Sequence, residues 1–250
     1  MLNVPETRQQ QLLAKLASGQ QLIAQDLAVE FDVSLDTIRR DIIALEQQGK
    51  AQRVRGGAVA TAPASPPLQY RVEAPSQAID AIAARASSLI NHADTLLLDG
   101  GATVLALAER LQPKPGLLVM TPSPWVAVAC QKNGVEVFML GGQLGVRGGV
   151  NVGDTALLAT ANLYADIAIL GACGLDAEFG LSADDLQEAY LKHAMSRAAK
   201  NTLVLTSREK IGRRARHRAV AIEDIDCLIT DAEAEEVKEF GSSAMEVVHA

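Results

Sequence analysis

The side chains best suited to bind another molecule are concentrated between Ser34 and Asp41, near the start of the chain. Hydroxyl, carboxylate and guanidinium groups follow one another there, on Ser34, Asp36, Thr37, Arg39 and Arg40. Hydroxyls and guanidinium groups donate hydrogen bonds to phosphate oxygens and to the edges of bases. This segment therefore predicts contacts with double-stranded DNA.

The apolar residues around this segment predict two helices joined by a tight turn. The first is expected over residues 25–31, and the second begins after Ser34, which can cap it. Each has apolar side chains along one face at helical spacing. They are Leu27, Ala28 and Phe31 in the first helix and Ile38, Ile42 and Leu45 in the second, which is expected to end near Gly49. This pattern is typical of a helix-turn-helix, whose second helix enters the major groove.

The flanking segments favour the winged form of this fold. Residues 6–17 predict a preceding helix, and residues 20–23 predict a short strand. Residues 52–59 alternate charged and apolar side chains around Gly56 and Gly57, as expected of a two-stranded wing. We expect base contacts from Ser34, Thr37 and Arg40, and phosphate or minor-groove contacts from Arg39, Arg53 and Arg55, with Asp36 in the same surface.

The distribution of charge agrees with a local DNA-binding surface. A net charge of −7 argues against a uniformly basic protein, but residues 1–60 hold seven Lys or Arg and seven Asp or Glu. From Arg39 to Arg55, five basic residues face only two acidic ones. A basic strip of this size is enough to contact phosphates.

A proline-rich segment divides the chain. Residues 61–76 contain four of its nine prolines, among alanines and serines, and predict a semi-rigid linker. We therefore expect a DNA-binding domain over residues 1–60, a linker over residues 61–76 and a second domain over residues 77–250.

Short apolar segments alternate with helical patterns throughout the second domain. Strands are expected at residues 95–99, 117–121, 135–140, 166–172, 202–207, 227–230 and 245–249, and helices at 79–90, 104–111, 125–131, 185–200 and 233–240. Nearly continuous apolar strands joined by helices predict an α/β fold with a mostly parallel sheet, buried on both faces.

Polar and glycine-rich segments follow several of these strands, where parallel sheets bind their ligands. They contain Asp99, Gly100, Gly101, Ala102 and Thr103 in the first, Thr121 and Ser123 in the second, Gly141 and Gly142 in the third, and Gly171 and Gly174 in the fourth. Glycines let backbone amides approach an anion, and hydroxyls add donors. A pocket for a small phosphorylated ligand is expected at this edge, although each Gly-Gly pair is also compatible with a simple tight turn.

The remaining composition excludes several classes of protein. No apolar run approaches the roughly 18 residues of a membrane span, and no signal peptide is expected. Cys130, Cys173 and Cys227 lie far apart in apolar sequence without any CxxC pattern, so we expect buried thiols, a cytoplasmic location, no metal and no cofactor.

These segments together resemble the DeoR family of bacterial regulators of sugar catabolism. The resemblance is carried by residues 33–34, 37–41, 45–46, 49 and 53–58, and further on by the glycine-rich segments and by Glu188 and Lys192. It implies a sensor domain similar in fold to ribose-5-phosphate isomerase and CoA transferases, without catalytic turnover. It also adds Glu188, Lys192 and Lys210 to the residues expected to bind a phosphorylated sugar or sugar derivative.

We therefore expect a DNA-binding transcriptional regulator, and most specifically a repressor of a carbohydrate-catabolism operon. Its partners would be operator DNA, a phosphorylated sugar effector and a second copy in a homodimer or homotetramer, because single helix-turn-helix units bind weakly. Activation in place of repression stays open. So does a sugar-phosphate isomerase-like enzyme with a DNA-binding appendage, using Asp99, Glu188 or Lys192 as acid and base. Glu188 and Lys192 also have the spacing of an ordinary helical ion pair.

Overall fold

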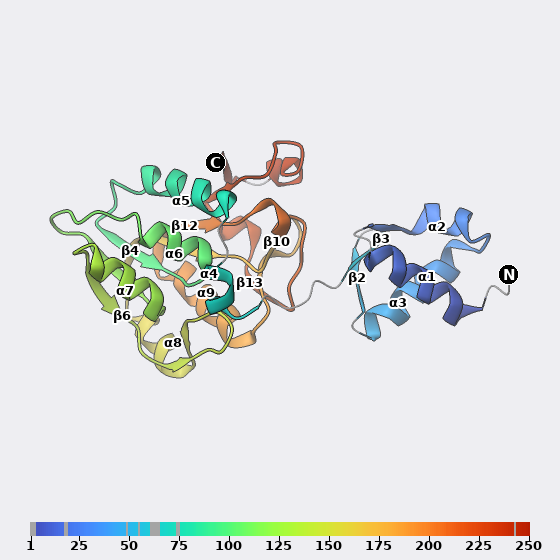
Figure 1. The fold of residues 1–250 in the computed structure, drawn as a ribbon, viewed down its shortest axis with the longest axis horizontal. Helices are drawn as coiled ribbons and strands as arrows, with labels where there is room; N and C mark the ends of the chain where they lie inside the picture. The colour runs from blue at the N-terminus through green and yellow to red at the C-terminus, as the bar shows by residue number, and fades with distance from the viewer. Residues whose placement is uncertain are drawn as a thin grey trace. The chain divides into compact units, whose positions relative to one another are not determined.

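The computed structural model describes residues 4–17, 20–48, 50–54, 56–60, 66–73, 76–242 and 244–250. The chain divides into two compact units, Met1–Pro63 and Ala64–Ala250 (Figure 1). Each unit has a hydrophobic core of its own, and each is described separately below.

The first unit has the order of helices and strands that the sequence predicts. Its elements are α1 (Pro5–Ala17), β1 (Leu22–Ile23), α2 (Ala24–Glu30), α3 (Leu35–Gln47), β2 (Ala51–Val54) and β3 (Gly57–Ala60). Ser34 caps α3 as expected, because its hydroxyl accepts a hydrogen bond from the Thr37 backbone amide at 3.2 Å. The apolar stripe of α3 is buried against Leu12 and Leu16 of α1 and Leu27 of α2. The winged helix-turn-helix is thus confirmed.

The wing differs from the expected hairpin in having a third strand. Besides the antiparallel pair β2 and β3, the short strand β1 pairs with β3, and the order is β1-β3-β2. Gly57 permits this arrangement, because a Cβ atom on it would collide with the Leu22 carbonyl. The third strand ties the wing to the turn that precedes α2.

The second unit is built on a seven-stranded, entirely parallel sheet with the order β15-β14-β12-β9-β4-β5-β6. The strands are β4 (Thr95–Leu98), β5 (Leu118–Thr121), β6 (Glu136–Met139), β9 (Ala165–Gly171), β12 (Ala199–Leu205), β14 (Cys227–Thr230) and β15 (Glu246–His249). The central residues of β4, β5, β9, β12 and β14 are buried, as the continuous apolar runs predict, whereas those of the edge strand β6 are exposed or only partly buried. The predicted α/β fold with a parallel sheet is confirmed.

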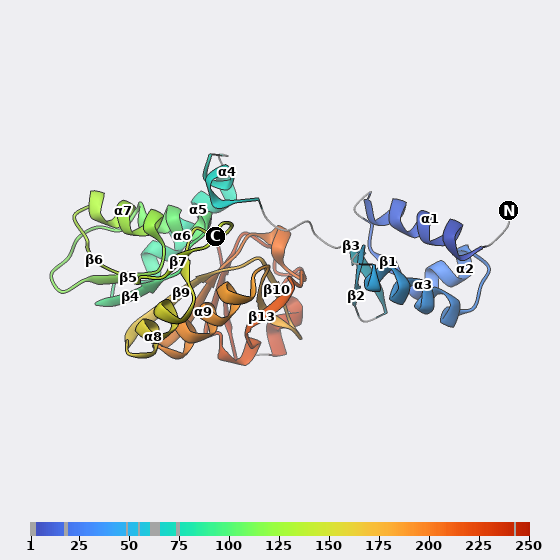
Figure 2. The same cartoon turned by 90° about the horizontal axis from the view of Figure 1, so that it is seen from below.

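Helices cover both faces of this sheet (Figures 1 and 2). Alternate residues of β4 show the division, since Leu96 and Leu98 belong to one core and Leu97 belongs to the other. The first core packs beneath α5 (Gln77–Leu89), α6 (Ala102–Ala108) and α7 (Pro124–Lys132), and the second beneath α8 (Asp154–Ala161) and α9 (Leu186–Arg197).

Smaller elements complete the second unit. They are the antiparallel sheet of β10 (Gly174–Asp176), β11 (Gly180–Ala183) and β13 (His217–Val220), the pair β7 (Gln143–Leu144) and β8 (Asn151–Val152), and the 3₁₀ segments η1 (Arg208–Lys210), η2 (Ile222–Asp224) and η3 (Lys238–Ser242). None of the helices in the described part of the chain is long and apolar enough to cross a membrane.

In the linker and the second unit, two predicted segments differ from the structure, and α8, β7, β8, β10, β11 and β13 were not predicted. The α-helix predicted over residues 233–240 is wrong, because turns and η3 occupy this region and only Val237 and Phe240 are buried there. The predicted linker is interrupted by α4 (Leu68–Val72), since Leu68 packs into the second unit with 2% of its surface exposed. Of the linker, residues 61–65 and 74–75 lie outside the described residues.

Candidate functional site

Helix α3 and the wing present the polar residues that were expected to contact DNA. Ser34, Asp36, Arg39 and Arg40 are exposed, and Thr37 is partly exposed. Several of these groups bond one another: the Ser34 and Thr37 hydroxyls lie 2.8 Å apart, and the Arg39 guanidinium pairs with Asp36 at 3.2 Å.

Two other arginines that were predicted to contact DNA, Arg53 and Arg40, have different surroundings. The Arg53 guanidinium lies 3.6 Å from the Glu46 carboxylate, and the Arg53 amide also donates to that carboxylate. Arg40 forms no ion pair with any residue that the structure describes, so its charge is directed to solvent. Arg55 and Gly49 lie outside the described residues.

A buried ion pair beneath this surface escaped the sequence analysis. Asp41, counted there among the acids of a basic strip, has 3% of its surface exposed and pairs with Arg8 of α1, which is 5% exposed. The Gln9 amide donates to the second carboxylate oxygen at 3.1 Å. Only the fold brings these residues together, from positions more than 30 residues apart in the sequence. The pair fixes α1 against the helix that carries Arg40.

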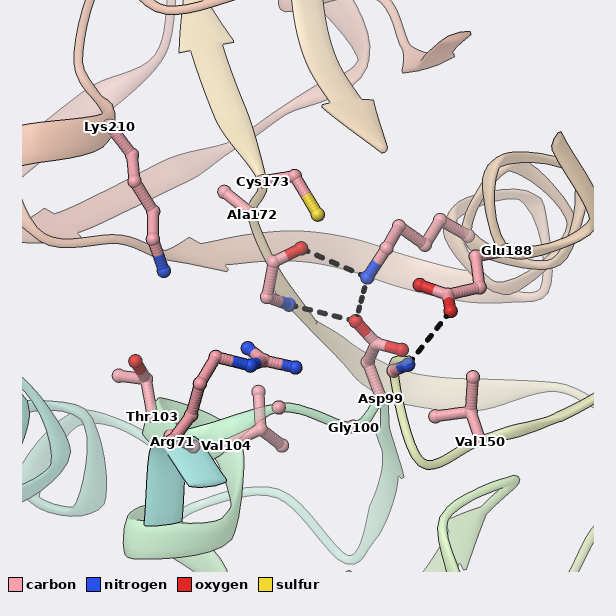
Figure 3. Close-up of a pocket in the computed structure, with 15 residues that line it drawn as sticks. Arg71, Asp99, Gly100, Thr103, Val104, Val150, Ala172, Cys173, Glu188 and Lys210 are labelled. Atoms are coloured by element: carbon pink, nitrogen blue, oxygen red, sulfur yellow. Dashed lines mark hydrogen bonds and ion pairs between the residues drawn. The ribbon is translucent and has the colours of Figure 1, made fainter. Parts of the chain in front are cut away.

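The second unit contains a pocket at the carboxyl ends of β4 and β9, where Figure 3 shows its lining. It encloses about 410 Å³, part of it open to solvent. Most of the predicted effector residues line it, namely Asp99, Gly100, Gly101, Ala102, Thr103, Gly171, Glu188, Lys192 and Lys210. The sequence analysis missed Arg71, Val104, Gly148, Val150, Ala172 and Cys173, which also line it.

Asp99, labelled in Figure 3, forms a buried ion pair with Lys192, which also lines this pocket. The Lys192 ammonium also donates to the Gly171 carbonyl at 3.0 Å, and the Gly171 amide donates to Asp99 Oδ2 at 3.0 Å. Burial alone would lower the pKa of Lys192, but the negative groups around it, with the Asp99 carboxylate first among them, together outweigh this effect, and the pKa is raised. The ammonium therefore stays charged and holds the ends of β4 and β9 together.

Glu188 lies one turn before Lys192 on α9 and reaches the loop that precedes β8. Its Oε1 accepts a hydrogen bond from the Gly148 amide at 3.0 Å. A Cβ atom at position 148 would lie 2.5 Å from the same oxygen, so a larger residue there would displace the Glu188 carboxylate. Burial raises the pKa of Glu188, against the opposing effect of the Lys192 charge. The expected Glu188–Lys192 ion pair is absent among the described residues, since Lys192 pairs with Asp99.

Two further cations point into the pocket from its opposite side. Arg71 comes from α4 and Lys210 from η1 (Figure 3). Burial lowers the pKa of Lys210, and the nearby Arg71 charge lowers it further. The positive charges of Arg71 and Lys210 therefore repel each other. An anion bound beside them would reduce this repulsion.

The other predicted effector residues lie outside this pocket and have structural roles. Thr121 and Ser123 are fully buried, and the Ser123 hydroxyl donates to the Gly149 carbonyl at 3.0 Å and caps α7. Gly142 approaches Val152, and Gly174 approaches the Arg213 backbone too closely for a side chain. Gly141 is exposed beside β7. Some polar and glycine residues that follow a strand therefore form turns or caps outside the pocket. Residue type alone does not distinguish them from the residues that line it.

Asp99, Glu188 and Lys192, which the sequence left as scattered candidates, converge in this pocket. Acid–base catalysis needs groups free to exchange a proton with a substrate, but here Asp99 and Lys192 are bonded to each other. Cys130 and Cys227 are buried as expected, whereas Cys173 is half-buried on the pocket wall. No group of three or more His, Cys, Asp or Glu in the described ranges could hold a metal ion.

Sequence comparisons match both units. A model of the DeoR-like helix-turn-helix domain matches residues 8–64, and a model of the DeoR C-terminal sensor domain matches residues 76–232. The chain is 31% identical over 229 residues to a candidate aga operon transcriptional repressor of Escherichia coli O157:H7, covering 90% of this chain and 85% of that protein. It is 29% identical over 210 residues to the glycerol-3-phosphate regulon repressor of Escherichia coli (strain K12), covering 83% of each.

Among solved structures, ribose 5-phosphate isomerase A from Methanocaldococcus jannaschii is similar at a TM-score of 0.38 and 13% identity, over 53% of this chain and 52% of that one. The relatives that match most of the chain are named as transcriptional repressors.

Proposed function

Because this chain belongs to the DeoR family of DNA-binding transcriptional regulators, we propose that it represses a carbohydrate-catabolism operon and that a phosphorylated sugar or sugar derivative controls its affinity for the operator. The relatives named above supply the class of operon, because they are named as repressors of the aga operon and of the glycerol-3-phosphate regulon. The chain is a regulator and not an enzyme.

The surroundings of Arg40 are the observation that best supports recognition of the DNA sequence by α3. Its side chain is exposed on the helix that a helix-turn-helix inserts into the major groove, and no described carboxylate pairs with it. A guanidinium in this position can donate two hydrogen bonds to one guanine. Arg39 and Arg53, which already have carboxylate partners, are better suited to phosphates, which exchange for those partners at little cost.

The sensor pocket has positive groups on one side and carboxylates on the other, and this arrangement supports a phosphorylated polyhydroxyl ligand. Arg71 and Lys210 supply positive charge on one side, where a phosphate would bind. On the other side, the Asp99 and Glu188 carboxylates offer acceptors for hydroxyl groups. A ligand with a phosphate at one end and hydroxyls at the other satisfies both sides, and no cofactor is required.

We further propose that the regulator acts as a homodimer or a larger homo-oligomer. Strand β6 ends the parallel sheet and carries Phe138 and Met139, with 50% and 48% of their surfaces exposed. Leu144 and Val128, nearby in β7 and α7, are about half exposed as well. An edge strand with apolar side chains can pair with a second copy. Two copies would present two recognition helices to paired half-sites.

Selection of bound fragments from random-sequence DNA by the full-length protein tests the DNA-binding part of this proposal. We expect a sequence with two half-sites related by a dyad and separated by about one helical turn. A bound pool without any shared sequence would contradict sequence-specific repression. A reporter carrying the selected site then separates repression from activation, since deletion of the regulator raises expression only if it is a repressor.

A further inference from the structure

Arg71 connects the pocket with the chain that enters the sensor unit. It lies in α4, the first helix of that unit, and lines the pocket together with Lys210 (Figure 3). Its Nε donates to the Pro66 carbonyl at 2.9 Å, and its Nη2 donates to the Arg147 carbonyl at 3.4 Å. A charged guanidinium in a ligand pocket is thus held by two neutral carbonyls, one of them five residues earlier in the chain.

The loop that contains Arg147 joins α4 to the other side of the pocket. The Leu68 amide donates to the Arg147 carbonyl at 2.9 Å. This one oxygen therefore accepts hydrogen bonds from two residues of α4, Leu68 and Arg71. The next residue, Gly148, donates its amide to the Glu188 carboxylate. Helix α4 is therefore connected to the pocket both through its own arginine and through this loop.

The chemistry of the guanidinium group favours an exchange of these partners. Arginine binds phosphate through two parallel charge-assisted hydrogen bonds, which are roughly twice as strong as bonds between neutral groups. The nearby Lys210 adds a second positive charge on the same side of the pocket. A phosphate in the pocket would therefore compete successfully with the carbonyls of Pro66 and Arg147 for the Arg71 guanidinium.

We propose that Arg71 binds the phosphate of the effector and leaves the Pro66 and Arg147 carbonyls in doing so. Occupation of the pocket is then transmitted to residues 66–72, and along the chain to the DNA-binding unit. This inference rests on the proposed function, because it takes a phosphorylated effector as given. It assigns Arg71 two roles, as a ligand of the phosphate and as the link between the pocket and α4.

The full-length protein and its Arg71→Gln variant test this assignment with inorganic phosphate and glycerol 3-phosphate as probes and glycerol as the unphosphorylated control. Glutamine keeps a donor for the carbonyls and removes the charge. Arg208→Gln is the matched control, because Arg208 is exposed, pairs with Glu236 and lies outside the pocket. Equal unfolding midpoints without ligand establish that each variant is folded.

We expect Arg71→Gln to weaken binding of the phosphorylated probes about 10- to 100-fold, as the loss of a charged hydrogen bond does, and Arg208→Gln to leave it unchanged. Hydrogen exchange of residues 66–72 should become faster when the wild-type protein binds either probe, but not in Arg71→Gln. Unchanged binding in Arg71→Gln, or exchange that does not accelerate in the wild type, overturns the inference. If Lys210→Ala loses binding while Arg71→Gln keeps it, the phosphate pocket stands and only the role of Arg71 fails. If neither probe binds the wild type, Arg71 does not bind phosphate in this pocket and the inference is overturned; the phosphorylated effector is then tested separately with other sugar phosphates.

Discussion

Charged side chains in this protein differ in role according to the groups around them. Arg8 and Asp41 are buried and hold two helices together, Asp99 and Lys192 are buried and hold two strands together, and Arg40 is exposed on the DNA-facing helix. The same residue types therefore serve structure in the first two cases and, as we propose, recognition of DNA in the third. Residue type alone does not separate these roles, so they are tested by substitution.

Arg40→Ala is expected to weaken binding to the selected operator about 10- to 100-fold and to change binding to random DNA little. The physical reason is that one arginine–guanine contact discriminates between bases by about 1–3 kcal/mol. The measurement is a titration of both DNAs at one fixed salt concentration. Arg53→Ala is the comparison, because loss of a phosphate contact weakens both DNAs alike and lowers the salt slope by about one. Equal losses on both DNAs for Arg40→Ala would exclude a base contact.

Glu188→Gln is expected to change the pH dependence of stability. Burial raises the pKa of Glu188 in the folded state above its value in the unfolded chain. The protonated side chain therefore makes its full contribution to the free energy of unfolding at low pH. That contribution is lost as the pH rises from the ordinary value of 4.5 through the raised one. Glutamine keeps the acceptor for the Gly148 amide without the charge. The unfolding midpoint of the variant should therefore rise relative to wild type between pH 4.5 and pH 7, and a constant difference would refute the argument.

At the scale of elements, the sequence predicted those whose residues carry a one-sided or continuous apolar pattern. Helix α3 shows its buried stripe directly, and the strands of the parallel sheet show continuous apolar runs. Helix α8 was missed because apolar residues are spread all around it, so its sequence does not mark the face on which Ala156 and Thr160 are buried. Strands β10 and β11 form a local hairpin but are too short to show an alternating pattern, and β13 was missed because it is defined by pairing with the distant β11.

The candidate site was predictable only in part, for a related reason. Asp99 and the glycines after β4 follow a strand directly, and position after a strand is visible in a sequence. Arg71 lies in a proline-rich segment, and only the packing of Leu68 places α4 beside the pocket. In the sequence, Asp41 belongs to a polar stretch of α3, and only the fold places Arg8 against it.

Asp41→Ala tests the attachment of α1 to α3. Removal of one partner from a buried ion pair costs about 3–5 kcal/mol, because the other charge keeps its desolvation cost. Hydrogen exchange of α1 and α3 in the full-length protein, followed at increasing urea, reports the free energy of unfolding of this unit. Asp36→Ala is the matched control, since its ion pair with Arg39 is exposed and contributes about 0–1 kcal/mol. Similar effects of both variants would show that the buried pair does not hold the unit together.

At the scale of the whole molecule, the proposed regulation requires two copies of the chain, operator DNA and a phosphorylated effector. Replacing Phe138, exposed on the edge strand β6, with lysine should dissociate the oligomer, because it places a charge in an apolar interface. Light scattering after size-exclusion chromatography measures the mass directly. Tyr164→Lys, at another exposed aromatic residue outside β6, serves as the control. An unchanged mass in Phe138→Lys would remove β6 from the interface.

We propose above all that a phosphorylated sugar-type ligand in the sensor pocket changes the affinity of this protein for its operator. The most direct test of this proposal is titration of the complex of full-length protein and selected operator with a panel of sugar phosphates, beside the same sugars without phosphate. Lys210→Ala is measured in parallel. We expect at least one phosphorylated compound to change operator affinity 5- to 150-fold, a coupling of about 1–3 kcal/mol, with a much smaller effect in Lys210→Ala. Operator affinity that no compound changes, or a response that Lys210→Ala retains in full, would contradict the account.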